Sequence, residues 1–144
     1  MVVRHAVSDD VDAIVAAYEW LFAPPGGPPP AWDPVAAAER LRTAIAGPDS
    51  AVFVEDAIGG FCTVYLDILS VRYGQRAWVE DLAVDPTQRS RGTGKALLDA
   101  ARAWAKEHGA THLELDSGDA RKDAHRFYER EGTSWTSRCF AYEL

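Results

Sequence analysis

The sequence predicts one domain of the α/β class, in its α+β form, with a mixed central sheet of six to seven strands and about four helices on both faces. Its 144 residues fit a single domain, 1–144, and its 47% hydrophobic content is that of an ordinary globular protein. Apolar residues at helical spacing alternate with β-rich runs in the order β-α-α-β-β-β-α-β-α-β. A strand joined to its neighbour through a helix favours a partly parallel sheet.

The first half of the chain contains clear start and stop signals. Strands are expected over 2–7, 51–55 and 61–70, and helices over 9–22 and 33–46. Asp33 and Pro34 form a favourable N-cap and first turn for the second helix. Residues 23–30 are too rich in proline and glycine for a helix or strand interior, so they predict a loop.

The second half alternates strands and helices. Strands are expected over 77–84 and 111–116, with one or two more over 135–144, and helices run from a glycine loop to about 108 and from about 119 to 130. The helix after the glycine loop has a strong apolar stripe, which includes Leu97, Ala101 and Trp104.

The composition excludes several classes of partner. A net charge of −7 argues against a nucleic-acid partner and mildly favours a cationic small molecule or peptide amine. No run approaches the roughly 18 apolar residues of a membrane span, so no membrane partner is expected. Cys62 and Cys139 lie far apart without metal-ligand spacing, which predicts reduced thiols in a cytoplasmic protein with no metal site.

The glycine loop is the main chemical signal. It follows the 77–84 strand, opens a helix, and comprises Arg89, Ser90, Arg91, Gly92, Thr93, Gly94 and Lys95. Free N–H groups at a helix N-terminus, with two arginines, are typical of an anion site. Ala96 follows Lys95 where a nucleotide P-loop needs Ser or Thr, and a dinucleotide fingerprint needs a third glycine. On spacing alone, an anion cradle and an ordinary glycine turn both remain open.

Two motifs together resemble the GNAT superfamily of N-acetyltransferases. Arg89, Gly92 and Gly94 are similar to the family's Arg/Gln-x-x-Gly-x-Gly/Ala motif for acetyl-CoA. Residues 124–132, with Phe127 and Tyr128, resemble its second motif, in which an alanine precedes an aromatic-Tyr pair and a glycine. The element order agrees with the family's fold, whose sheet is splayed at its centre, across nearly the whole chain.

The resemblance implies a site for acetyl-CoA, used as a cosubstrate. Leu82, Ala83 and Val84 would pair their backbone with the pantetheine arm like an added strand. The N–H groups of residues 89–94 would hold the pyrophosphate. The family often has Asn three residues before the second-motif alanine, and here Arg121 stands there. This departure puts the Asn contact in doubt, and Arg121 is expected to reach the cofactor phosphates instead.

The implied reaction is direct acetyl transfer to a primary amine in a ternary complex. The resemblance makes Tyr128 the general acid for the leaving thiolate. Glu80 and Asp81 are the candidate bases. As neighbours on a strand they are expected to face opposite sides, and a bulge would turn Glu80 into the site. Asp81, or a water chain, remains the other possibility for the base.

The acceptor side is less defined. Trp20 and Trp32 flank the proline-rich loop, and Asp116 and Ser117 follow the 111–116 strand, so we expect these four to bind the acceptor. An aminoglycoside, a polyamine, an amino acid or a peptide N-terminus would all fit. A CoA-binding regulatory or interaction domain without activity, and a transferase of a longer acyl group, remain alternatives. Exposed strand edges would allow a homodimer.

Overall fold

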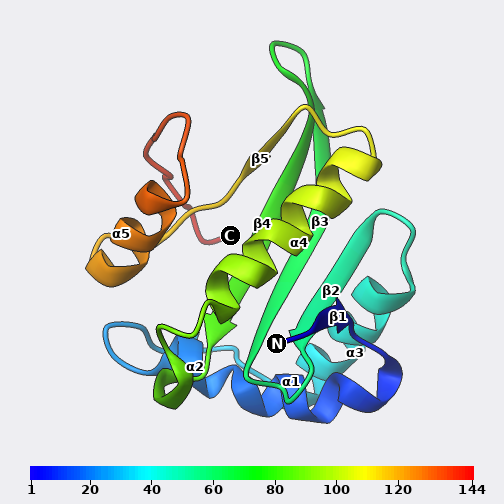
Figure 1. Ribbon diagram of the computed structural model, residues 1–144, viewed down its shortest axis with the longest axis vertical. Coiled ribbons are helices and arrows are strands. Elements are labelled where there is room, and N and C mark those ends of the chain that lie inside the picture. Colours follow the sequence, from blue (N-terminus) through cyan, green and yellow to red (C-terminus); the bar gives the residue numbers. More distant parts are fainter.

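The computed structural model describes residues 1–144 and contains one mixed sheet with helices on both faces (Figure 1). Its strands are β1 (Val3–His5), β2 (Ser50–Glu55), β3 (Gly60–Ser70), β4 (Gly74–Val84) and β5 (His112–Glu114). They lie in the order β1-β2-β3-β4-β5, with antiparallel pairs except β4 and β5, which are parallel. The predicted mixed sheet with a parallel pair is confirmed.

The helices start largely where the sequence predicts. They are the 3-10 turns η1 (Ser8–Asp10) and η2 (Pro86–Gln88), and α1 (Val11–Ala17), α2 (Glu19–Phe22), α3 (Pro34–Ala46), α4 (Thr93–Glu107) and α5 (Lys122–Arg130). Asp33 caps α3 by accepting from the Val35 N–H at 3.0 Å. The single helix expected over 9–22 is interrupted at Tyr18, whose side chain is held against the sheet. None of these helices is both long enough and apolar enough to cross a bilayer.

Each face of the sheet buries its own apolar cluster. Helix α4 lies across β3 and β4 (Figure 1), and its cluster contains Leu97, Ala101, Trp104, Cys62, Val64, Ala77 and Val79. Helices α1 and α3 cover the other face, with Val11, Ile14, Leu41, Val52, Val54, Phe61 and Ala83. The periodic stripe of each helix therefore meets the alternating side chains of the strands, as binary patterning requires.

Leu97 offers a direct test of this packing. Its side chain is fully buried between α4 and the sheet. We expect Leu97→Ala to lower the free energy of unfolding by about 3 kcal/mol, through lost transfer energy and a residual cavity. Val35→Ala is the control, because that side chain is 69% exposed, and it should cost under about 0.5 kcal/mol. Urea unfolding followed by tryptophan fluorescence measures both, and equal costs would contradict the assignment of the core.

The prediction of strands over 135–144 is wrong, so the sheet has five strands instead of six to seven. This segment has no regular structure, and Phe140 and Tyr142 are 75% and 85% exposed. A strand needs a partner edge, and β5 offers only three residues. The tail is instead anchored by Trp135, whose ring stacks on Tyr73 with centroids 6.0 Å apart.

Candidate active site

The parallel strands β4 and β5 separate part-way along β4. Their pairing ends at Trp78 and Glu114, whereas β4 continues to Val84. Leu82 and Ala83 still pair with β3, opposite Cys62 and Phe61, so the other edge of this part of β4 has no strand partner. Backbone groups of residues 82–84 on that edge are therefore free to pair with an extended ligand.

A β-bulge lies at the point of separation. Thr63 of β3 pairs with Asp81, but the next residue, Val64, pairs with Val79, so Glu80 is the extra residue of β4. The bulge reverses the alternation along the strand. Val79 belongs to the cluster under α4, whereas beyond the bulge Ala83 belongs to the cluster under α1 and α3.

The bulge corrects the expectation that Glu80 and Asp81 face opposite sides. Glu80 accepts a hydrogen bond from Nε1 of Trp78 at 2.9 Å, and Trp78 points away from α4 because Ala77 and Val79 point toward it. Asp81 reaches Tyr18 of the α1 side at 2.6 Å. Both carboxylates thus lie on the same side of the sheet, and both raise the pKa of the Tyr18 hydroxyl, after the larger effect of its burial.

The two carboxylates differ in exposure and in bonding. Asp81 is half-buried and accepts a hydrogen bond from the Tyr18 hydroxyl, and its backbone N–H donates to Thr63 Oγ1 at 3.1 Å. Glu80 is exposed. Desolvation raises the pKa of both acids, and the neighbouring Asp81 charge raises that of Glu80 further. Glu80 is therefore the more accessible base, and its proton affinity is above that of an ordinary glutamate.

Helix α5 directs its two adjacent aromatic residues differently. Phe127 packs near Gly94, where an added Cβ would lie 3.4 Å from the ring. Tyr128 is half-buried near Arg121 and Asp81, and burial raises its pKa to about 12. No protein hydrogen bond engages its hydroxyl, and Ser117 Oγ is the one buried side-chain polar atom without a partner. The Tyr128 hydroxyl stays protonated at neutral pH and free to donate.

The glycine loop forms a row of unpaired donors. None of the backbone N–H groups of residues 89–95 donates a hydrogen bond to another protein group. Ser90 and Gly92 have φ angles of 64° and 82°, and alternation of such conformations turns successive N–H groups toward one point. The N-terminus of α4 adds its dipole at Thr93. This geometry fits a phosphate group, such as the pyrophosphate of the acetyl-CoA that the family resemblance implies.

Not every side chain of this loop is available to a ligand. Arg89 and Arg91 are exposed and unpaired. Lys95 is bonded to Asp99 at 3.0 Å and lies 3.5 Å from Glu131. Thr93 is buried, and its Cγ2 packs against Gly60. The loop therefore offers mainly backbone N–H groups and two arginines.

The residues predicted for the acceptor side separate into two groups. Trp32 packs at a tilt against Tyr18 and edge-on against Phe22, with ring centroids 5.3 and 4.7 Å apart, and Tyr18 is bonded to the Asp81 carboxylate. Trp20 instead lines a shallow groove with Ala16 and Ile58, outside this aromatic cluster. Asp116 acts on the pKa of Asp81 and Glu80, which places it near both acids, and Ser117 follows it.

Comparison with known proteins assigns the family. Residues 14–132 match the model of the Acetyltransferase (GNAT) family. The chain belongs to this family. It is similar to an uncharacterized N-acetyltransferase, YhdJ, of Bacillus subtilis, with 42% identity over 78 residues, 54% of each chain. It is also similar to the streptothricin acetyltransferase of Streptomyces lavendulae, with 32% identity over 58% of this chain and 44% of that one. The chain thus spans about half the length of these relatives.

Solved structures agree with this GNAT fold. An aminoglycoside N-acetyltransferase, AAC(6')-Iy, in complex with CoA superimposes with a TM-score of 0.83 at 17% identity, over 99% of this chain and 93% of that one. Another, meta-AAC0020 from a soil metagenome, in complex with sisomicin, gives 0.74 at 20% identity, over 99% and 95%. At these identities the likeness concerns the fold. Acetyl-CoA is the acetyl donor of the family to which this chain belongs.

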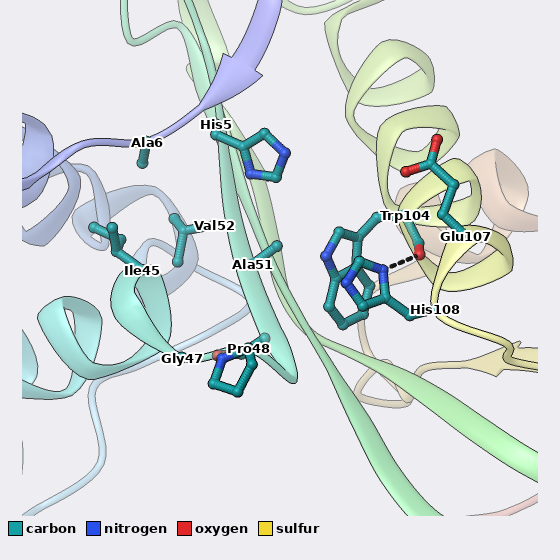
Figure 2. A pocket seen from close by; sticks show the side chains of 11 residues that line it. His5, Ala6, Ile45, Gly47, Pro48, Ala51, Val52, Trp104, Glu107 and His108 are labelled. Carbon is teal, nitrogen blue, oxygen red and sulfur yellow. Dashed lines mark hydrogen bonds between the residues drawn. The ribbon is translucent and has the colours of Figure 1, made fainter.

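One cavity of this GNAT chain lies away from these residues. It measures about 380 Å³ and lies between β1, β2 and the end of α4, and His5 and His108 are among its lining residues (Figure 2). His108 is held by its Nδ1 on the Trp104 carbonyl at 2.8 Å. None of the residues that line this cavity is predicted to take part in the reaction.

Sequence analysis missed two contributors to the site. Tyr18 reads as part of an apolar helix stripe, and only its polar tip signals that a buried partner is needed. Thr63 accepts a hydrogen bond from the Asp81 N–H at the bulge, and no sequence pattern around Thr63 predicts this contact. Arg121 donates from Nη2 to the Leu21 carbonyl at 2.8 Å, and its contact with the cofactor stays a prediction.

Proposed function

We propose that this GNAT chain transfers an acetyl group from acetyl-CoA to a primary amine of a small molecule or peptide, by direct attack within a ternary complex. The observation that carries the proposal is the row of unpaired N–H groups at 89–95, directly after the strand that bears the bulged Glu80. A donor site and a base thus lie on one continuous segment, with Tyr128 supplied by α5.

Each residue has a defined role in the proposal. Bound acetyl-CoA supplies an activated thioester. The N–H groups of residues 89–94 and the arginines hold its pyrophosphate, and the free edge at residues 82–84 pairs with its amide arm. Glu80 takes the proton from the ammonium, whose pKa near 10 otherwise keeps it unreactive. As the carbon–nitrogen bond forms and the carbon–sulfur bond breaks, Tyr128 donates its proton to the sulfur, and the second proton that the nitrogen loses on becoming an amide restores the Tyr128 hydroxyl.

The charges around the site favour a cationic acceptor. Burial raises the pKa of Glu80 and Asp81, the Asp116 charge raises both further, and the Asp81 charge also raises the pKa of Glu80. The aromatic cluster of Tyr18, Phe22 and Trp32 flanks Asp81. Arg121 is the one cation whose charge acts on Asp81. An amine that carries a second positive charge, such as an aminoglycoside or polyamine, suits this surrounding better than an acidic peptide.

Thiol release with an amine panel tests the function. We expect CoA release from acetyl-CoA with a polyamine, an aminoglycoside, an amino acid amide or a peptide N-terminus, and none without amine. Tight acetyl-CoA binding with no release from any amine would instead favour a CoA-binding interaction domain. Faster release from a longer acyl-CoA would favour an acyltransferase of that chain length.

Gly92 tests the cofactor cradle. We expect Gly92→Ala to raise the Kd for acetyl-CoA roughly tenfold, because a Cβ disfavours φ of 82° and the N–H groups would turn away from the phosphates. Gly109→Ala is a matched control at the other end of α4, with φ of 80° and equally open surroundings. Both variants should lose about 1 kcal/mol of stability, but only Gly92→Ala should lose affinity in calorimetry. Equal affinities would refute the assignment of the loop.

A further inference from the structure

Arg121 connects two distant parts of the site. It is the N-cap of α5, the helix that carries Tyr128. Its guanidinium Nη2 donates to the carbonyl of Leu21 at 2.8 Å, across a sequence separation of 100 residues. Leu21 lies in α2, between Tyr18 and the proline-rich loop. One charged hydrogen bond therefore joins the acceptor-side aromatic cluster to the helix of the proposed general acid.

The surrounding structure is built to receive this guanidinium. The Leu21 carbonyl belongs to the single turn of α2, where the last carbonyls lack partners within the helix and can accept from an outside donor. The loop folds back over the contact at Gly26, where an added Cβ would collide with both the Leu21 oxygen and Arg121 Nη2. Only a glycine at 26 therefore lets the loop close on the contact.

The charge of Arg121 acts on side chains of both β4 and α5. It lowers the pKa of Asp81, against the larger effect of burial, and it lowers that of Tyr128. Asp81 is in turn the partner of the Tyr18 hydroxyl. The guanidinium charge thus acts on both Asp81 and Tyr128, and the group is also hydrogen-bonded to the Leu21 carbonyl.

We propose that Arg121 is a positioning residue, which clasps α2 and the 23–32 loop to the start of α5 and so sets the acceptor pocket against Tyr128. In this role it orders the acceptor side and makes no contact with acetyl-CoA. The clasp itself is a property of the free protein. Only its expected effects on the kinetics rest on the proposed function.

Two substitutions break the clasp from opposite sides. Arg121→Met removes the donor, and Gly26→Ala keeps the arginine but pushes the loop away from it. Gly27→Ala is the matched control for the loop, because an added Cβ there meets nothing within 4 Å. Arg126→Met is the control on α5, since that side chain is 66% exposed. Arg121→Lys keeps the charge and should recover part of any loss.

Hydrogen exchange of the free protein measures the clasp directly. Loss of one charged hydrogen bond should speed exchange of the amides in 19–32 roughly tenfold in Arg121→Met and Gly26→Ala, and leave both controls at the wild-type rate. Unchanged exchange in both test variants would overturn the proposal. This measurement stands whether or not any amine is acetylated, so it separates failure of the clasp from failure of the proposed function.

Kinetics then distinguish positioning from cofactor binding. With an active amine, we expect both test variants to raise the KM for that amine about tenfold and to change the KM for acetyl-CoA less than twofold. A rise in the KM for acetyl-CoA in Arg121→Met, with the amine KM unchanged, would assign Arg121 to the cofactor instead and refute the clasp.

Discussion

Tyr128→Phe is expected to lower kcat about 100-fold, within the range of a lost general acid, while the KM for acetyl-CoA changes less than about twofold. The ring is retained, so packing against the surrounding side chains is preserved. The lost hydroxyl is protonated at neutral pH, because burial raises the pKa of Tyr128 to about 12, and it has no competing protein partner. Its removal leaves the departing thiolate without a proton donor.

Steady-state kinetics under saturating amine and acetyl-CoA measure the effect. Tyr142→Phe serves as control, because that ring lies in the tail and is 85% exposed. The loss in Tyr128→Phe should also shrink for a thioester with a more acidic thiol, which needs less help in leaving. A kcat within twofold of wild type, with chemistry shown to be rate-limiting, would remove Tyr128 from the mechanism.

Glu80→Gln is expected to lower kcat/KM for the amine about 100-fold at neutral pH and to flatten the acid limb of the pH profile. A base acts in its ionised form, so activity in the wild type falls as pH drops through the pKa of Glu80. Desolvation and the Asp81 charge raise that pKa, so the limb should lie above the usual glutamate range. The amide cannot take a proton at any pH.

Asp81→Asn and Glu39→Gln complete this test. Asp81→Asn keeps an oxygen that can accept from the Tyr18 hydroxyl but removes the negative charge, so it should weaken binding of a cationic amine and retain the acid limb. Glu39 is exposed on α3, and its substitution should leave the profile unchanged. If Asp81→Asn abolishes the limb and Glu80→Gln retains it, the roles of the two acids are reversed.

Local sequence was sufficient to predict the secondary-structure elements that contain the acetyl-CoA motif. The strand before the glycine loop, the loop and the apolar stripe of α4 are contiguous, and each obeys short-range rules of turn chemistry and periodicity. Gly92 occupies a left-handed backbone position that few other residues adopt. Phe127 and Tyr128 are adjacent, so helical geometry already required them to point in different directions. The bulge at Glu80 agrees with the expectation that followed from the family resemblance.

Other features depended on partners far along the chain. The 135–144 segment alternates like a strand, but a strand forms only where an edge is free to pair, and β5 proved too short. Tyr18 belongs by spacing to the helix stripe, and its bond to Asp81 spans 63 positions. Arg121 has a charge suited to phosphate, yet its bond goes to a carbonyl 100 positions away.

The sequence by itself therefore determined the family and the mixed sheet, and it predicted the residues of the proposed donor loop, because their signals reside in contiguous segments. Only the tertiary structure decided that Glu80 and Asp81 share a side, that Tyr18 bonds to Asp81, and that Arg121 donates to the Leu21 carbonyl. Such contacts depend on strand register and on the packing of separate elements, and neither is encoded within any one segment.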